Sequence, residues 1–289
     1  MKNLTAVAFV ALSSATAFAA DLPARIYTKA PIEAPVYSWN GFYVGANAGY
    51  AWGDNDINVA SVPVFVNTVN FGSPDIVNTA ATAGTAALSQ NHGGFIGGVQ
   101  AGYNWQFSSL VAGVEADIQG IVDNNRSATA ALNSSVVTNI TASQGLNWLG
   151  TVRGRLGVTI MPTLLAYVTG GLAYGEANSD FEMSQSHVTQ RGNGPTASGL
   201  TVASLSELKA GWTVGGGMEW AFAPNWSVKA EYLYYDLGGA TYGGGLLTSA
   251  LPDGTVRYSI RSNVGTDFTG NIIRAGVNYR WGGPVVAKY

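Results

Sequence analysis

Glu115 and Asp117 are the residues whose type and spacing come closest to a catalytic arrangement. They lie two positions apart in an alternating segment, so in a β-strand both side chains point to the same face. Two carboxylates on one face could act as general acid and general base. However, Arg153 and Arg155 have the same spacing in a later segment. Because buried charges must be paired, we predict that these four residues form a charge network rather than a catalytic site.

Residues for other kinds of site chemistry are scarce. The chain has no cysteine, which excludes disulfides, thiol catalysis and cysteine zinc sites. Its two histidines, His92 and His187, fall outside the alternating segments, so we expect no Ser–His–Asp hydrolase and no enzyme. The run Asp54-Asn55-Asp56 lacks the glycine and the distal glutamate of a calcium loop. We therefore predict no catalytic residue, no metal site and no cofactor.

The amino-acid composition indicates the class of fold in which these charged residues lie. Only 11% of the 289 residues are charged, whereas typical soluble domains have about 25%. The chain also has 38 glycines, 14 tyrosines, 10 phenylalanines and 8 tryptophans. No apolar run of about 18 residues follows the N-terminus, so a helical membrane span is not expected. This composition favours a β-barrel in lipid, and the net charge of −3 argues against nucleic-acid binding.

The N-terminus has the three parts of a secretory signal peptide. Lys2 precedes a short apolar run, LTAVAFVAL, and the small-x-small sequence AFA ends at Ala19. We predict that residues 1–19 are removed by cleavage after Ala19, with cleavage after Ala20 as the alternative. Residues 20–40 contain several prolines and no periodicity, so we expect an extended periplasmic arm.

Residues 41–281 alternate with period two and predict one domain. In residues 42–52 every even position is apolar, and the odd positions are small or polar. Such a strand has one face for lipid and one for a polar interior. The pattern recurs in residues 95–107, 110–119, 148–158, 164–174, 212–220, 226–234 and 273–281. We predict an all-β, transmembrane, antiparallel up-and-down barrel of about eight strands, followed by a tail of residues 282–289.

The connections between these segments alternate strictly in length. Three are short, around residues 108–109, 159–163 and 223–225. Four are long and polar, at residues 53–92, 122–145, 176–208 and 238–269. In outer-membrane barrels the short turns are periplasmic and the long loops are extracellular. We therefore expect four long surface loops, with both termini in the periplasm.

A soluble β-sandwich is the alternative fold. It would bury its apolar faces in a core and would have no reason to place tryptophan at strand ends. Here aromatic residues mark the ends of the apolar face, as in the two girdles of a membrane barrel. They are Trp52, Trp105, Trp148, Tyr174, Trp212, Trp220, Trp226, Tyr279 and Trp281. Their positions favour the membrane barrel.

The polar face carries further charges besides the first four. An eight-stranded barrel has an interior just wide enough for side chains to fill. We therefore interpret the inward charges as packing of the interior, with a transport site as the alternative. The complete set has six positive and four negative residues: Glu115, Asp117, Arg153, Arg155, Lys209, Glu219, Lys229, Glu231, Arg274 and Arg280.

The strand sequences carry a resemblance to a known family. The segments are AFAADLP, WNGFYVGANAGYAWG, GGFIGGVQAGYNWQ, WLGTVRGRLG, TLLAYVTGGLAYG, GWTVGGGMEWAF, WSVKAEYLYYDLG and IRAGVNYRW. Together the chain resembles the small outer-membrane β-barrel proteins of Gram-negative bacteria, the outer membrane immunogenic protein or opacity-like porin family. The quoted segments cover the leader and seven of the eight predicted strands, all but residues 110–119, and almost none of the long loops.

The resemblance implies a location and partners. It implies a surface antigen of the outer membrane, surrounded by lipid and lipopolysaccharide, that meets periplasmic chaperones and the barrel-insertion machinery during biogenesis. The last strand is similar to the assembly signal that this machinery reads, with Arg274, Gly276, Tyr279 and Trp281 in the matching positions. The chain departs from the family in continuing to residue 289 beyond the final aromatic residue.

Three functions follow from this interpretation. The leading one is a structural barrel that contributes to envelope integrity and displays surface loops. A narrow porin for small solutes is the first alternative. Adhesion or ligand binding by the loops is the second.

Overall fold

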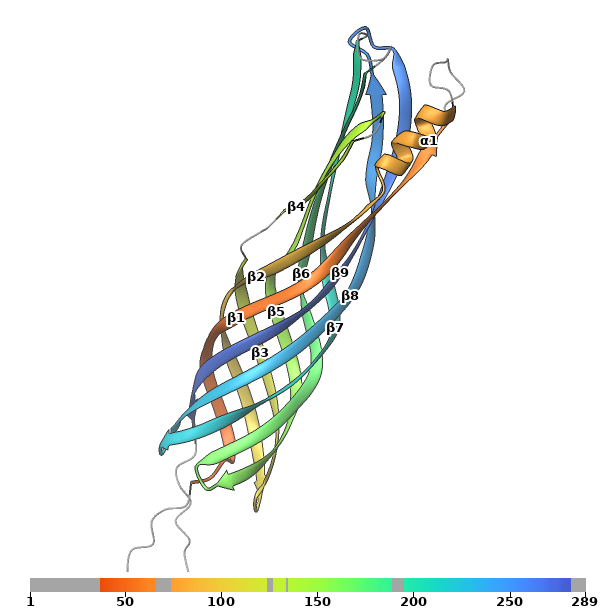
Figure 1. Cartoon of the computed structure of the whole chain (residues 1–289). Coiled ribbons are helices and arrows are strands. Elements are labelled where there is room, and N and C mark those ends of the chain that lie inside the picture. The colour runs from red at the N-terminus through yellow and green to blue at the C-terminus, as the bar shows by residue number, and fades with distance from the viewer. Residues whose placement is uncertain (1–36, 66–73, 124–126, 134, 189–194, 282–289) are drawn as a thin grey trace, which may run out of the picture. The chain divides into compact units, whose positions relative to one another are not determined.

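The computed structural model describes residues 37–65, 74–123, 127–133, 135–188 and 195–281, and these form one antiparallel sheet closed into a barrel (Figure 1). Each strand of the ring pairs antiparallel with the next strand of the ring, including β3 with β5, and β1 pairs with β9 to close it. The strands of the ring are β1 Gly41–Val64, β2 Ala86–Phe107, β3 Leu110–Asp123, β5 Val137–Met161, β6 Leu164–Val188, β7 Thr196–Ala223, β8 Trp226–Ala250 and β9 Val256–Arg280. The predicted eight-stranded up-and-down barrel is confirmed.

The remaining strand, β4 (Ala128–Asn133), occupies no place of its own in the ring. It pairs with β5 from Ala128↔Ala142 to Asn133↔Val137. The other half of β5 pairs with β3, up to Gly120↔Trp148. β3 and β4 therefore follow one another along the same edge of β5.

The four long loops predicted from the sequence are largely strands, so that prediction is wrong. β1 continues to Val64, and its ladder with β2 extends to Val59↔Ala86. β6 and β7 pair as far as Val188↔Thr196. His92 and His187 accordingly lie within β2 and β6, not outside the strands. The backbone groups of these segments are hydrogen-bonded in ladders, which a polar loop would leave to water.

The reason the sequence pattern missed these extensions is a reversal of polarity along each strand. In the first half of β1, outward residues such as Tyr50 and Trp52 are apolar and exposed. Beyond residue 55 the alternation continues, but Ile57 and Val59 are buried inside while Asp56 and Asn58 are exposed outside. An apolar outer face suits lipid and a polar outer face suits water. The ring therefore consists of a lipid-type half and a water-type half.

The water-type half has its own apolar core. The β7–β8 ladder is interrupted between Ser198↔Ala250 and Trp212↔Asp236, so the described strands there group as β4-β5-β6-β7 and β8-β9-β1-β2. Helix α1 (Pro74–Ala83) packs on this core. The buried residues include Ile57, Val59, Val77, Ala80, Leu88, Ile140, Phe181, Met183, Leu247, Ile260 and Val264. No helix in the described ranges reaches the length and apolarity needed to cross a membrane.

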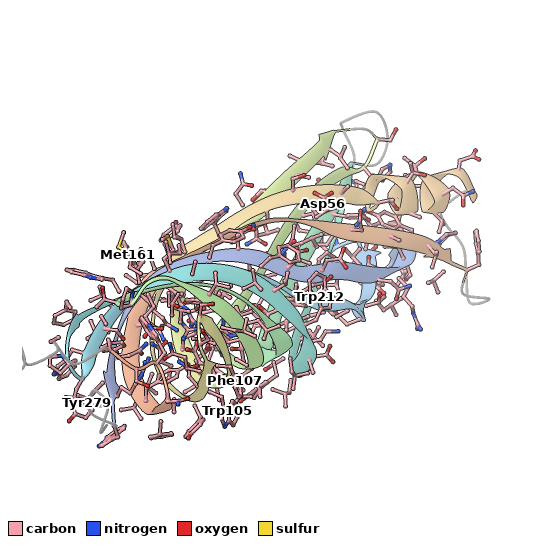
Figure 2. The ribbon with its side chains drawn as sticks, turned by 90° about the horizontal axis from the view of Figure 1, so that it is seen from below. Asp56, Trp105, Phe107, Met161, Trp212 and Tyr279 are labelled. Carbon is pink, nitrogen blue, oxygen red and sulfur yellow. The ribbon has the colours of Figure 1, made fainter. Side chains whose placement is uncertain are left out.

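The aromatic residues of the lipid-type half face outward near its two ends. Trp105, Phe107 and Tyr279 point away from the interior (Figure 2). At the other end, Trp148 meets Tyr174 and Trp212 meets Tyr234, with ring centroids 5.8 and 5.4 Å apart. This arrangement matches the two predicted girdles.

Candidate functional site

The candidate site lies inside the lipid-type half, between two apolar layers. At the short-turn end, Tyr37, Trp39 and Leu165 belong to one buried cluster. On the other side, Leu149, Leu233 and further buried residues form a second cluster. The charged residues between them lie on β3, β5, β7, β8 and β9. The described interior is therefore layered: apolar, charged and apolar.

Strand register brings opposite charges together. Glu115 on β3 lies directly opposite Arg153 on β5. Glu219 on β7 lies opposite Lys229 on β8. Glu231 on β8 lies opposite Arg274 on β9. Residues paired in this way have Cβ atoms about 4.5–5.5 Å apart, so each pair needs no special conformation to meet.

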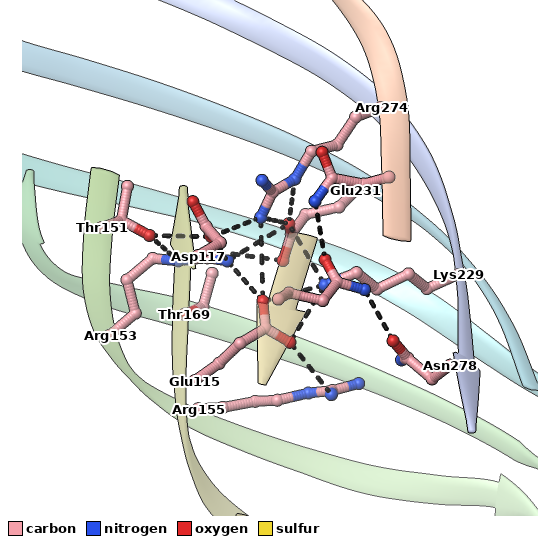
Figure 3. Close-up of polar contacts among 12 residues, drawn as sticks. Glu115, Asp117, Thr151, Arg153, Arg155, Thr169, Lys229, Glu231, Arg274 and Asn278 are labelled. Atoms are coloured by element: carbon pink, nitrogen blue, oxygen red, sulfur yellow. Dashed lines mark hydrogen bonds and ion pairs between the residues drawn. The ribbon is translucent and has the colours of Figure 1, made fainter. Parts of the chain in front are cut away.

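Arg153 is the centre of the network (Figure 3). Its Nη2 lies 2.5 Å from Glu115 Oε1 and 2.8 Å from Asp117 Oδ2, and its Nη1 lies 3.0 Å from Glu231 Oε1. Arg274 Nη2 contacts two of the same carboxylates, Asp117 at 2.9 Å and Glu231 at 2.6 Å. Two guanidinium groups thus hold three carboxylates.

Lys229 and Arg155 extend the network around the ring. Lys229 Nζ lies 2.8 Å from Glu115 Oε1 and 3.7 Å from Glu231 Oε2. Arg155 pairs with Glu219, and its guanidinium stacks 3.6 Å from the ring centroid of Tyr167. Glu219 also accepts hydrogen bonds from Ser227 Oγ at 2.5 Å and Asn278 Nδ2 at 3.0 Å.

Arg280 is the fifth cation of the set. Its Nη2 lies 3.5 Å from Glu219 Oε1. Its guanidinium carbon also lies 4.7 Å from the Trp39 ring and 5.8 Å from the Tyr43 ring. Aromatic faces attract a desolvated cation, so these rings stabilise a charge that shares its carboxylate with Arg155.

Every charge in the network is buried. The side chains of Glu115, Asp117, Arg153, Arg155, Glu219, Lys229, Glu231, Arg274 and Arg280 each have relative exposures of at most 5%. Five cations therefore face four carboxylates away from bulk solvent. Desolvation of an ion costs several kcal/mol, and only close pairing with good geometry offsets it. The geometry fixes the charges against one another.

Lys209 is the one predicted member that the structure places elsewhere. Its Nζ donates to the carbonyl oxygen of Gly239 at 2.5 Å and lies 3.2 Å from Glu207. Along β7 it is ten positions from Glu219, or roughly 33 Å at the usual strand rise. The alternation of β7 correctly places Lys209 on the inward face, but it does not show how far along the strand Lys209 lies from the other charges. The prediction that Lys209 belongs to the charge network is therefore wrong.

Sequence reasoning missed several aromatic members of the site. Tyr43 Oη donates to Glu115 Oε2 at 2.7 Å, and Tyr167 Oη donates to Glu231 Oε1 at 3.2 Å. Both occupy the inward positions of their strands, and that parity was an available signal. Trp39 lies in the segment that the sequence predicts to be an extended arm, but it is buried, and its Nε1 donates to the carbonyl of Pro162 at 3.1 Å.

The remaining predicted sites are a metal site, the assembly signal on the last strand and the two ends of the chain. Among the described residues, no group of three His, Cys, Asp or Glu side chains could hold a metal ion. Of the predicted assembly signal, Arg274 belongs to the network, whereas Tyr279 and Trp281 pack edge to face with ring centroids 5.1 Å apart. Its role in insertion stays a prediction. The signal peptide with Ala19 and the tail of residues 282–289 lie outside the described residues.

Comparison with known proteins gives the family. The sequence profile described as "Outer membrane protein beta-barrel domain" matches residues 5–281. The "31 kDa outer-membrane immunogenic protein" of Brucella melitensis biotype 1 is 39% identical over 243 residues, covering 82% of this chain and 88% of that protein. The "22 kDa outer membrane protein" of Rhizobium leguminosarum bv. viciae is 28% identical over 240 residues, covering 83% of this chain and 82% of that protein.

Among solved structures, the attachment invasion locus protein Ail of Yersinia pestis matches with 14% identity and a TM-score of 0.28, covering 81% of this chain and 99% of that one. The profile spans nearly the whole chain, and the barrel, the girdles and the relatives agree with it. The chain belongs to the outer membrane protein β-barrel domain family and is a protein of the bacterial outer membrane.

Proposed function

We propose that this protein is a structural outer-membrane barrel with a filled interior, which contributes to envelope integrity and displays β-structure at the cell surface. The observation that carries the proposal is the layered interior. Apolar clusters around Trp39 and Leu233 lie on either side of the buried ion pairs. A water-filled channel would solvate these charges, whereas here they are paired with one another.

The surface half of the molecule supports the display role. Strands β6 and β7 carry their ladder to Val188↔Thr196, and α1 covers the apolar core between the strands. A packed core makes this region a fixed surface rather than a set of mobile loops. Recognition of a partner by this surface is an alternative function. The protein is proposed to have no enzymatic activity.

A narrow porin for small solutes is the alternative that one observation favours. Within the described chain, Asp117 Oδ1, Gln119 Nε2 and both side-chain atoms of Asn104 are buried and have no hydrogen-bond partner. Buried polar atoms of this kind are commonly satisfied by ordered water. Isolated waters fit a filled interior, but a continuous file of water would fit a pore.

Single-channel recording of the refolded mature protein in a planar bilayer separates the two functions. We expect little or no steady conductance, because both apolar layers must open before ions can pass. The control for insertion is the heat-modifiable gel band of protein recovered from the same proteoliposomes. Reproducible conductance steps with ion selectivity, from protein that passes this control, would establish the porin instead.

A further inference from the structure

We propose that residues 37–40 form a strap that closes the short-turn mouth of the barrel and can leave it while the ring of strands stays intact. Outer-membrane barrels have their short turns on the periplasmic side. Release of the strap would therefore open the charged layer to the periplasm. The inference rests on the filled interior of the proposed function and identifies the part of that filling that moves.

The strap reaches across the mouth to the opposite side of the ring. It precedes β1, and Trp39 Nε1 donates to the carbonyl oxygen of Pro162 at 3.1 Å. Pro162 lies in the turn between β5 and β6, which is separated from β1 by β2 and β3 in one direction and by β7, β8 and β9 in the other. At the end of β2, Gln106 Oε1 accepts a hydrogen bond from Trp39 N at 2.7 Å. At the end of β9, Arg280 Nη1 donates to the carbonyl oxygen of Ser38 at 3.4 Å. Three separate parts of the rim thus hold the strap across the opening.

Trp39 is the side chain of the strap that fills the mouth. It is the largest fully buried side chain in the described ranges. The apolar cluster around it contains Tyr37, which also belongs to the strap, and four residues of the strands: Val111, Leu165, Tyr167 and Ala221. If the strap left, the charged layer would be covered at this end by only those four members of the cluster. Access of water to the charges therefore depends on where Trp39 lies.

The strap lies outside the strand ladders. β1 enters its ladder with β2 at Gly41 and its ladder with β9 at Tyr43. Within the described chain, no backbone–backbone hydrogen bond involves residues 37–40. The hydrogen bonds that hold the strap all use a side chain, as when Asn40 Oδ1 accepts from Gln106 N at 2.6 Å. Segments without ladder bonds open at a lower free energy than the strands of a core, so the strap can be released without opening the ring.

The second apolar layer, on the far side of the charges, is built differently. Its buried residues, which include Leu149, Leu233 and Ile272, all lie on strands of the ring. They cannot leave the interior unless the strands themselves separate. Release of the strap therefore opens the charged layer toward one side only. The periplasm gains access to the charges, but no continuous channel forms through the barrel.

Arg280 connects the strap to the charged layer. Its guanidinium carbon lies 4.7 Å from the centroid of the Trp39 ring and 5.6 Å from that of the Tyr37 ring. Its Nη2 lies 3.5 Å from Glu219 Oε1, and Glu219 also pairs with Arg155. A guanidinium pays a desolvation cost in the interior, which is recovered when water reaches it. Hydration of Arg280 therefore offsets part of the packing that is lost when the strap leaves.

A single thiol reports on access to the interior, because the sequence has no cysteine of its own. Ser227→Cys places the thiol on the inward face of β8, at a buried position directly opposite Ala221 of the Trp39 cluster. The measurement is the rate at which a charged, water-soluble methanethiosulfonate modifies this thiol in the refolded mature protein. We expect Trp39→Ala to raise that rate about tenfold, equivalent to about 1.4 kcal/mol. The matched control is Trp220→Ala, which removes an exposed, outward tryptophan near the same end of the barrel and should leave the rate unchanged.

A milder variant decides the matter if Trp39→Ala gives no heat-modifiable band. Gln106→Ala removes the acceptor of Trp39 N and keeps the indole ring, so the rate should rise about fivefold, the effect of about one net hydrogen bond. Equal rates in the Trp39→Ala and Trp220→Ala proteins, or in the Gln106→Ala protein and the unchanged strap, would overturn the proposal.

The strap and the filled interior can fail separately. With the strap intact, the thiol of Ser227→Cys should react far more slowly than that of Ser109→Cys, which lies at an exposed position in the β2–β3 turn. Equal rates at these two positions would mean that the mouth is already open, which would overturn the strap. Single-channel conductance of the wild type would overturn the filled interior, and a rate that still depends on Trp39 would then keep the strap as a gate of that pore.

Discussion

At the residue scale, the pairing of the buried charges depends on which cationic side chains contact the same carboxylate. Glu115 and Arg153 could be paired from the sequence because both lie on the polar face of neighbouring alternating segments, and the structure places them directly opposite. Lys209 lies on the same polar face but far along β7 from the other charges, where its Nζ donates to the carbonyl of Gly239. Tyr43 also lies on the polar face, but its sequence position does not show that its hydroxyl donates to Glu115 on another strand. Alternation determines the face, and only register determines the neighbours.

Arg153→Ala is the residue-scale prediction. Its guanidinium contacts three buried carboxylates, so its removal leaves charge uncompensated. We expect the free energy of unfolding, measured by urea titration in lipid vesicles, to fall by about 3–5 kcal/mol. Lys209→Ala is the control, because Lys209 makes a partly exposed pair of the kind worth about 0–1 kcal/mol. Equal midpoints for the two variants would mean that water already solvates the network.

At the element scale, each strand contains two sequence patterns with opposite polarity. In β6, Val168, Leu172 and Tyr174 face outward in the lipid-type half, whereas Glu182 faces outward farther along. Met183 then provides the buried side. The sequence predicted only the first pattern because an apolar outer face is the signal for a membrane strand. The second half resembles a polar loop, since its core forms only when distant strands and α1 meet.

Met183→Asp tests this second core. A carboxylate at a fully buried apolar position has no partner in the core, so the surface extension should open. Limited proteolysis of proteoliposomes should then cleave within residues 176–208 and leave a membrane-protected fragment. Glu182→Lys, the outward neighbour, should keep the protease resistance of the wild type. Resistance of the Met183→Asp protein would contradict a packed extracellular core.

At the scale of the whole molecule, closure of the sheet was the part most accessible from sequence. Eight alternating segments with short and long connections in strict turn permit few arrangements other than an up-and-down ring. The structure adds the closing ladder between β1 and β9, from Tyr43↔Arg280 to Val64↔Ser259. β4 could not be predicted because it has six residues and no place of its own in the ring. Lipid-type strands in a closed ring leave no edge free.

Closure predicts that a proline within the ring is not tolerated. Ala275 on β9 pairs with Ala48 on β1 and Ala230 on β8, so it has a neighbour on both sides. Ala275→Pro removes a backbone donor and should abolish the compact band that unboiled samples of the wild type give in SDS gels. Ala275→Val keeps the donor and adds an apolar group on the exposed outer face, so it should migrate as the wild type does. In an open sheet with β9 at an edge, one side of Ala275 would be unpaired and proline there could be accommodated. A heat-modifiable Ala275→Pro protein would therefore indicate an open sheet, and the β1–β9 ladder would have to be abandoned.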